Sequence, residues 1–447
     1  MVRIFRQTLT PWAALAAMGL VSGALHAQSL VEMTEMAMGY DAQWLASRAA
    51  LDAAQHKGAQ AQAGLLPSVG AQAGASYTNL QIHPQIAGIK EGMAQQSASL
   101  NASQPLYRPA NLIGYRQGQR NVELARAQLD AATQDLLVRT SQAYFDVLAA
   151  QDTLATVQAQ KRAVQEQLEF AQRNFDIGAA TITDTREAQA RRDLSDAQEI
   201  AATNDLQVKR LALEQLVGKS PLSPLPLAQP VQLPPLLPGN LALWVEQAEQ
   251  EQPQVRQARL ALDLAELETR KAETGHLPTV DLQASYGVQR NPDGTTTIPI
   301  KNRIHQGQVG VALNIPLFAG FSVQNRVKET LSLEEKARAD LDHARRSSAQ
   351  AARTAFFGVQ SGQGQVKALE AAVASSQSAL EANQLGYQVG VRINVDVLNA
   401  QSQLYQTQRD LAQARYSVLM GQLKLRQAAG QLQLQDIHGL NQLLTKP

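Results

Sequence analysis

The segment Asn174-Phe175-Asp176-Ile177-Gly178-Ala179-Ala180-Thr181-Ile182-Thr183-Asp184 returns in altered form as Gly386-Tyr387-Gln388-Val389-Gly390-Val391-Arg392-Ile393-Asn394-Val395-Asp396, 212 positions later. Each copy has an aromatic residue, a glycine three positions on and an aspartate nine positions on. Glycine soon followed by Asp or Asn is typical of a chain that ends one helix and begins another. The pattern predicts two helical hairpins, each turning within one copy.

Other segments recur at nearly the same offset, so the chain is an internal duplication. Leu66-Pro67-Ser68-Val69 returns as Leu277-Pro278-Thr279-Val280, and Gln104-Pro105-Leu106-Tyr107 returns as Ile315-Pro316-Leu317-Phe318, both 211 positions later. We expect a first repeat at 28–218, a second at 241–430 and a C-terminal tail at 431–447. Residues 219–240 hold seven of the 18 prolines. This segment is expected to be an extended strap between the repeats.

Each repeat is predicted to contain a short helix, two strands, a very long helix, a tight turn and a medium helix. No proline lies between Asn111 and Phe175, and apolar or small residues recur there at alternating steps of three and four. That spacing is the period of a coiled-coil seam. About 65 residues at 1.5 Å each make a rod of roughly 100 Å. A similar pattern runs from about Phe321 to Tyr387.

The predicted strands have one apolar and one polar face. Val280, Leu282 and Ala284 alternate with polar residues, the turn Asn291-Pro292-Asp293-Gly294 follows, and residues 309–317 alternate in the same way. This alternation fits an outer-membrane barrel or a half-buried soluble sheet. Four strands cannot close a membrane barrel, and open sheet edges cannot face lipid. Either the sheet is soluble, or several copies of the chain each contribute four strands to one barrel.

The N-terminal segment, residues 1–27, has the features of a secretory signal peptide. Arg3 and Arg6 precede an apolar stretch, and small residues allow cleavage after Ala24 or Ala27. An N-terminal membrane anchor is the alternative, but the apolar stretch is short for a membrane span. We therefore expect an exported protein.

The composition gives no support for an enzyme or a nucleic-acid-binding protein. Among 447 residues, 40 Lys and Arg balance 39 Asp and Glu, and there is no cysteine. No basic excess indicates nucleic acid, and thiol nucleophiles and Cys-ligated metals are excluded. The seven histidines show no His-Glu-x-x-His spacing, and Val217-Gly218-Lys219-Ser220 lacks the earlier glycine of a P-loop. We expect no catalytic site, no metal site and no cofactor.

The two turns, the duplication and the Leu-Pro signals together resemble the TolC family of outer-membrane efflux and type I secretion channels. The resemblance extends over essentially the whole mature chain. It implies a mainly α fold with β structure: a trimeric α-helical barrel, and four strands per chain in a shared twelve-stranded β-barrel. The strap would lie around the middle of the tunnel. The helix from about Thr185 to Val217 would stack on the short helix before Leu277, and the helix after Asp396 on the one containing Leu45 to Ala63.

The resemblance also implies a function and partners. The homotrimer would lie in the outer membrane of a Gram-negative cell, contact outer-membrane lipid and extend into the periplasm. It would export drugs, proteins or both, together with a periplasmic adaptor (membrane-fusion) protein and an inner-membrane pump or ABC transporter. The alternative is that the chain is itself a periplasmic coiled-coil adaptor. That alternative explains the long helices but needs no duplicated amphipathic strands.

The site residues implied by the resemblance fall into four groups. Gate links would join Tyr387 to Asp184 and Arg392 to Thr183. A constriction ring would carry Asp396, with Asn399 at a second position that is acidic in well-known family members. The adaptor-facing turns comprise Ile177, Gly178, Ala179, Val389, Gly390 and Val391, and the strand–helix junctions carry Pro67, Pro105, Pro278 and Pro316. The local sequence also predicts helix caps. Asp184 with Glu187 is expected to cap the helix after the first turn, and Asn394 or Asp396 is expected to cap the helix after the second turn.

Overall fold

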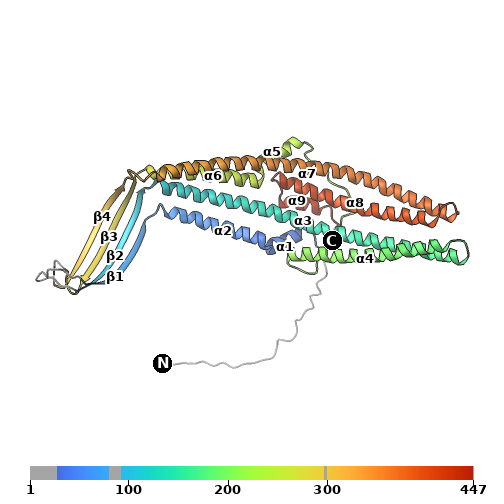
Figure 1. Ribbon diagram of the computed structural model, residues 1–447, viewed down its shortest axis with the longest axis horizontal. Coiled ribbons are helices and arrows are strands. Elements are labelled where there is room, and N and C mark those ends of the chain that lie inside the picture. The colour runs from blue at the N-terminus through green and yellow to red at the C-terminus, as the bar shows by residue number, and fades with distance from the viewer. Residues whose placement is uncertain (1–27, 80–91, 296–297, 299, 446–447) are drawn as a thin grey trace, which may run out of the picture.

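The computed structural model describes residues 28–79, 92–295, 298 and 300–445. The predicted signal peptide, residues 1–27, lies outside the described residues. The chain forms a long curved rod with a sheet at one end and two helical turns at the other (Figure 1). A single core does not dominate this shape, because most elements are arranged in one layer along the rod.

The two halves contain the same elements in the same order. The first half consists of α1 (Leu30–Tyr40), α2 (Ala42–Ala63), β1 (Ser68–Asn79), β2 (Gly92–Tyr107), α3 (Pro109–Asp176) and α4 (Ile182–Val217). The second consists of α5 (Leu241–Glu251), α6 (Pro253–Glu273), β3 (Thr279–Asn291), β4 (Asn302–Asn314), α7 (Ser322–Gln388) and α8 (Asn394–Ala428). The predicted internally duplicated fold is confirmed. The segment expected to be a plain tail contains a further helix, α9 (Leu434–Asn441).

The two long helices span most of the rod. α3 has 68 residues and α7 has 67. Pro109 is in the first turn of α3, where the missing N–H has no intrahelical partner to lose. Within the described residues, no helix has both the length and the apolar character needed to cross a membrane.

The four strands form one antiparallel sheet in the order β1-β2-β3-β4. In the β3–β4 pair, Leu282 lies opposite Val311 and Ala284 opposite Val309, while Ser285 lies opposite Gln308. Side chains alternate between the two faces of a strand, so one face is apolar and the other polar, as predicted. β1 and β4 are the two edge strands. Their backbone groups on the outer side are therefore available to another strand.

The shorter helices stack within each repeat, which corrects the expectation of stacking between repeats. Gly218, at the end of α4, lies against the ring of Tyr40 at the end of α1, and Gly430, just after α8, lies against Gln252 between α5 and α6. Both glycines have positive φ, 74° and 75°, a conformation that residues with a Cβ rarely adopt. A larger residue would also collide with the helix end it faces, so these glycines permit the close end-to-end approach.

The main hydrophobic core lies at the middle of the rod. Leu30 and Met33 of α1, Tyr144 of α3 and Leu419 of α8 are buried together there, with Ile437 of α9. The proline-rich segment 219–240 contains no helix. It packs three leucines, Leu222, Leu225 and Leu227, into the same core. The Tyr144 hydroxyl donates a hydrogen bond of 2.9 Å to the Leu225 carbonyl. The strap is thus held to the long helix by both apolar and polar contacts.

Asp41 fixes the break between α1 and α2. Its carboxylate accepts hydrogen bonds from the Trp44 N–H at 2.8 Å and from the Arg139 guanidinium at 3.0 and 3.2 Å. The hydrogen bond from Arg139 is the largest cause that lowers the pKa of Asp41. One side chain therefore caps α2 and ties it to α3.

We expect Asp41→Ala to lower the free energy of unfolding by about 2–4 kcal/mol, because a helix cap and charged hydrogen bonds are lost together. Denaturant unfolding in detergent, followed by circular dichroism, measures this loss. Asp41→Asn keeps the cap and should lose less. Folding lowers the pKa of Asp41. The stability that the contact with Arg139 provides is therefore complete above about pH 3.9, the ordinary pKa of an aspartate, and is lost as the pH falls below that value. Asp52→Ala, at an exposed position of α2, is the control, and equal losses in both alanine variants would contradict this account.

Candidate functional site

The first helical turn is built by a glycine and a capping box. α3 ends at Asp176, Gly178 has φ of 76°, and the N–H groups of Ala179 and Ala180 donate to the Asn174 carbonyl at 2.7 and 3.1 Å. The N-cap of α4 is Thr181, whose hydroxyl and N–H both donate to the Asp184 carboxylate, at 2.7 and 3.0 Å. The predicted cap by Asp184 with Glu187 is therefore wrong. The helix begins three residues earlier because Thr181 and Asp184 complete the box.

The second turn has the same backbone path but different capping. Gly390 also has φ of 76°, and the N–H groups of Val391 and Arg392 donate to the Gly386 carbonyl at 2.8 and 3.0 Å. The N-cap of α8 is Ile393, which makes no side-chain cap hydrogen bond. Neither Asn394 nor Asp396 caps α8, contrary to the prediction. Their side chains are used in other contacts.

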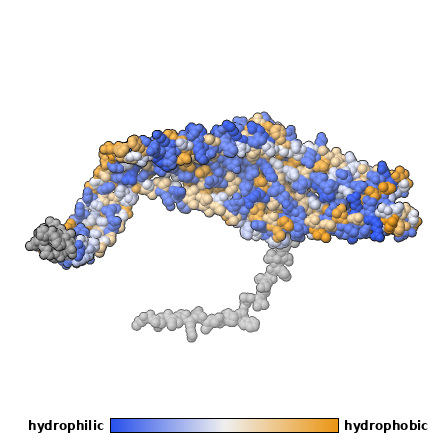
Figure 2. All heavy atoms as spheres, viewed as in Figure 1, coloured by the Kyte–Doolittle hydropathy of each residue, from blue (hydrophilic) through white to orange (hydrophobic). Residues whose placement is uncertain are grey.

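The two turns carry exposed apolar side chains. Ile177 is 77% exposed, Val389 65% and Val391 78%. Together with Gly178, Ala179 and Gly390 they form the tip of the rod, and Figure 2 shows hydrophobic residues gathered at this end. Exposed apolar residues at a tip that lies far from the core are typical of a contact surface for another protein.

Tyr387 does not make the predicted hydrogen bond to Asp184. Its ring packs against Phe170 of α3, with centroids 5.6 Å apart. Its hydroxyl is buried and has no partner of hydrogen-bonding geometry among the described residues. Burial raises the pKa of Tyr387, the nearby Asp184 carboxylate acts in the same direction, and Asn174 opposes both. The Asp184 carboxylate instead accepts the two hydrogen bonds from Thr181 at the start of α4.

Two of the other predicted residues, Asp396 and Asn399, contact arginines. Arg392 lies 3.6 Å from the Asp396 carboxylate, one turn along α8, and no hydrogen bond or ion pair to Thr183 occurs within the described part of the chain. Asn399 accepts a hydrogen bond of 2.8 Å from Arg191 of α4. The structure therefore brings Arg392 and Asp396 together, and it joins Asn399 to the first hairpin.

Asn394 makes cross-hairpin contacts that the sequence prediction missed. It is fully buried, donates to the Asp184 carbonyl at 3.1 Å, and accepts from the Gln167 amide. The second hairpin is thereby bonded to both helices of the first. Asn394 begins the buried row of α8 that continues with Val397, Leu398 and Gln401. A polar residue in an apolar seam is the signal that identifies such a position.

At the opposite end of the long helices, the four junction prolines lie at or beside strand ends. Pro67 and Pro278 immediately precede β1 and β3, Pro316 follows β4, and Pro105 lies within β2 at a shift in register. Next to this shift, Arg108 binds both oxygens of the buried Asp281, at 2.8 and 2.6 Å. A bidentate arginine–carboxylate pair is among the stronger polar contacts in proteins, so it fixes the position of α3 relative to the sheet.

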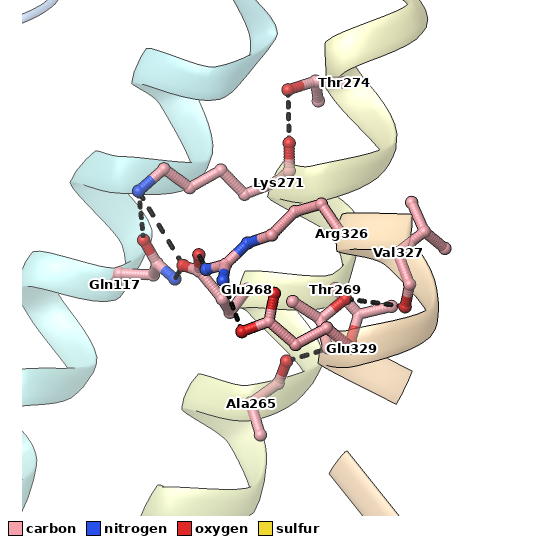
Figure 3. Close-up of polar contacts among 10 residues, drawn as sticks. Gln117, Ala265, Glu268, Thr269, Lys271, Thr274, Arg326, Val327 and Glu329 are labelled. Carbon is pink, nitrogen blue, oxygen red and sulfur yellow. Dashed lines mark hydrogen bonds and ion pairs between the residues drawn. The ribbon is translucent and has the colours of Figure 1, made fainter. Parts of the chain in front are cut away.

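A second polar cluster joins three helices below the sheet (Figure 3). Glu268 of α6 accepts from Gln117 of α3 at 2.8 Å and from Arg326 of α7 at 2.7 Å, and Lys271 lies 3.8 Å away. Burial raises the pKa of Glu268, but the hydrogen bonds and positive charges outweigh burial and the net shift is downward. The carboxylate therefore stays charged and holds the layer together where it meets the sheet.

The chain was compared with known proteins. The family model for "Outer membrane efflux protein" matches residues 36–219 and again residues 244–431. The chain is 32% identical over 433 residues to "Outer membrane protein TolC" of Vibrio cholerae, with 97% of this chain and 98% of that protein covered. It is 31% identical over 418 residues to "Alkaline protease secretion protein AprF" of Pseudomonas aeruginosa, with 92% and 86% covered.

Solved structures show the same fold. The outer membrane protein VceC of Vibrio cholerae superposes with a TM-score of 0.78 at 20% identity, covering 90% of this chain and 96% of that one. The CmeC outer membrane channel of Campylobacter jejuni gives a TM-score of 0.78 at 15% identity, with 98% of each chain covered. Because the family model matches most of the chain, in two copies that follow the structural duplication, the protein belongs to the outer membrane efflux protein family.

Proposed function

We propose that three copies of this chain form a duct through the outer membrane and the periplasm. The duct serves as the exit of a tripartite efflux or type I secretion system. Family membership supports this function most directly. One relative is named for the secretion of alkaline protease, and another is named a "Proteases secretion protein". Export of small molecules, of proteins or of both is consistent with these names.

The sheet supports assembly in a membrane. Its apolar face carries two pairs of residues that lie opposite each other on β3 and β4. They are Leu282 with Val311 and Ala284 with Val309. Edge strands β1 and β4 can each pair with a strand of a neighbouring copy. Three chains then supply twelve strands, enough to close a barrel, and closure removes every edge from the lipid.

The helical layer supports the same assembly. Apolar side chains are exposed along its two margins. They are Leu194, Ile200, Val208 and Leu211 on α4, and Leu331, Leu333, Phe357 and Leu385 on α7. These side chains are 47–72% exposed, so burying the remainder in a neighbouring copy contributes about 1–2 kcal/mol each. A periplasmic adaptor would explain the long hairpins, but it has no use for the apolar face of the sheet.

Channel recordings test the function. The purified mature chain, added to a planar bilayer, is expected to produce discrete current steps. Val309→Arg places a charge on the apolar face, which costs about 2–4 kcal/mol near the middle of a bilayer, and should abolish insertion. Gln308→Arg changes the polar face of the same strand and should still give channels. If the wild-type chain gives no current steps, or both variants insert equally, the proposed function is wrong.

The hydrogen bonds of Asn394 should restrict the entrance at the turns. Each such bond contributes about 1 kcal/mol, or about 2 kcal/mol for the two, so Asn394→Ala is expected to increase the open fraction of the channel roughly thirtyfold in bilayer recordings. Tyr387→Phe is the matched control, because the hydroxyl it removes has no partner of hydrogen-bonding geometry among the described residues. The opposite outcome, opening in Tyr387→Phe and none in Asn394→Ala, would contradict this prediction. It would support the gate link at Tyr387 that the sequence predicted.

The exposed tip is the surface we propose for the periplasmic adaptor. Ile177→Asp combined with Val391→Asp should abolish export in cells, because charge replaces apolar contact area, while channel conductance in bilayers stays normal. Ile300→Asp, an exposed apolar position at the sheet end of the rod, is the control and should export normally. Drug susceptibility or secretion measures export, and unimpaired export by the double variant would rule out this surface.

A further inference from the structure

Two arginines face each other across the β3–β4 pair. Arg290 and Arg303 are directly opposite in register, and both are exposed. They lie on the same face as Val288, because side chains two positions apart on a strand share a face. This is the apolar face, so the like charges lie on the surface that would meet lipid.

No acidic group compensates this pair within the described residues. Neither guanidinium has a carboxylate within ion-pair distance there. Asp293, the acidic residue of the adjoining turn, accepts a hydrogen bond from the Ala94 N–H at 3.1 Å. On the same face, His305 lies opposite Val288, and its ring nitrogen is 3.1 Å from the Tyr286 hydroxyl. Like charges directly opposite each other destabilise a sheet, so an anion between the two arginines would stabilise it.

The arginines lie where the apolar band ends. From Val280 to Val288 the face spans nine residues, and a tilted strand needs about 9–11 residues to cross the apolar layer of a membrane. Arg290 is two residues beyond this band, toward the loop end of the sheet (Figure 1). A charge is costly at the midplane of a bilayer and nearly neutral at its interface. The arginines are therefore placed at the depth of lipid headgroups.

The other end of the band has a different chemistry. Leu317, Phe318 and Phe321 are exposed there, beside the start of α7, and Leu317 is 93% exposed. Hydrophobic residues gather at this junction (Figure 2). Apolar and aromatic anchors thus mark the helix end, and paired positive charges mark the loop end. At the loop end, the paired positive charges would favour an anionic headgroup.

We propose that Arg290 and Arg303 bind a phosphate group of a phosphorylated glycolipid in the outer leaflet of the outer membrane. The inference rests on the proposed function, because it requires the sheet to span that membrane with its loops outward. Two guanidinium groups across a strand pair can each donate two parallel hydrogen bonds to phosphate oxygens. A trimer would carry three such sites around its barrel.

Native mass spectrometry of the detergent-solubilised full-length mature protein tests the site, with diphosphoryl lipid A as the probe. The wild type is expected to bind it at least tenfold more tightly than fully dephosphorylated lipid A. Arg290→Gln combined with Arg303→Gln should remove that preference. Arg345→Gln combined with Arg353→Gln removes the same charge from exposed positions of α7 and should bind like the wild type. Equal binding by the wild type and the sheet double variant would overturn the proposal.

Two further experiments test whether lost binding reflects misfolding, and whether the site binds lipid or free phosphate. Arg303→Glu places an opposite charge beside Arg290, which favours strand pairing, so this variant should fold and still lose the lipid. Its retention of lipid A would also overturn the proposal. Inorganic phosphate at millimolar concentration should not displace the lipid, because it lacks the acyl chains that contact the apolar band. Displacement by phosphate would show a site for free anions instead.

Channel formation in planar bilayers separates this inference from the proposed function. If the wild type forms channels and lipid A binding is unchanged by the sheet double variant, only the lipid site is wrong. If the wild type forms no channels, the proposed function fails, and the membrane placement on which the lipid site depends fails with it.

Discussion

The unpaired edges of a four-stranded sheet are the constraint on which the rest of the molecule depends. β1 and β4 each present one row of backbone donors and acceptors to the outside, and one face of the sheet is apolar. Buried backbone groups need partners, and in lipid only other strands can supply them. In the proposed trimer, neighbouring copies of the chain would satisfy both edges at once. The same neighbours would cover the exposed apolar side chains of α4 and α7, so the sheet and the helices favour the same assembly.

The two ends of the rod are held together by different kinds of polar contact. At the sheet end, charged contacts hold the layer in place: Asp281 is bound in bidentate fashion by Arg108, and Glu268 by three helices. At the turn end, the cross-hairpin contacts include the two neutral hydrogen bonds of the buried Asn394 and a single hydrogen bond from Arg191 to Asn399, and none of them joins two charged groups. A firmly held anchor and a weakly bonded entrance suit a duct that opens when a partner binds. The middle of the rod, where the strap packs against α1 and α3, separates the two.

The sequence was sufficient to predict the fold because its signals are local and repeated. Gly178 and Gly390 mark turns in both copies, and the alternation around Leu282 and Val311 marks strands. The details that depend on competition between side chains were not predictable. The sequence predicts both a helix cap and a gate contact for Asp184, but the hydroxyl of Thr181, three residues away, donates to its carboxylate. The sequence predicts a cap at Asn394, because its actual partner, Gln167, lies 227 positions earlier in the chain. The stacking of α4 on α1 depends on the fit of Gly218 against Tyr40, which no periodicity reveals.

Disulfide cross-linking between edge strands tests the central claim most directly, because the chain has no cysteine of its own. One cysteine at Gly74 of β1, combined in turn with cysteines along β4, reports whether the two edges of neighbouring copies meet. The account predicts that cysteines at some β4 positions give a covalent trimer as the largest species after oxidation in the membrane. Oxidation that leaves only single chains at every position, or that stops at covalent dimers, would contradict it.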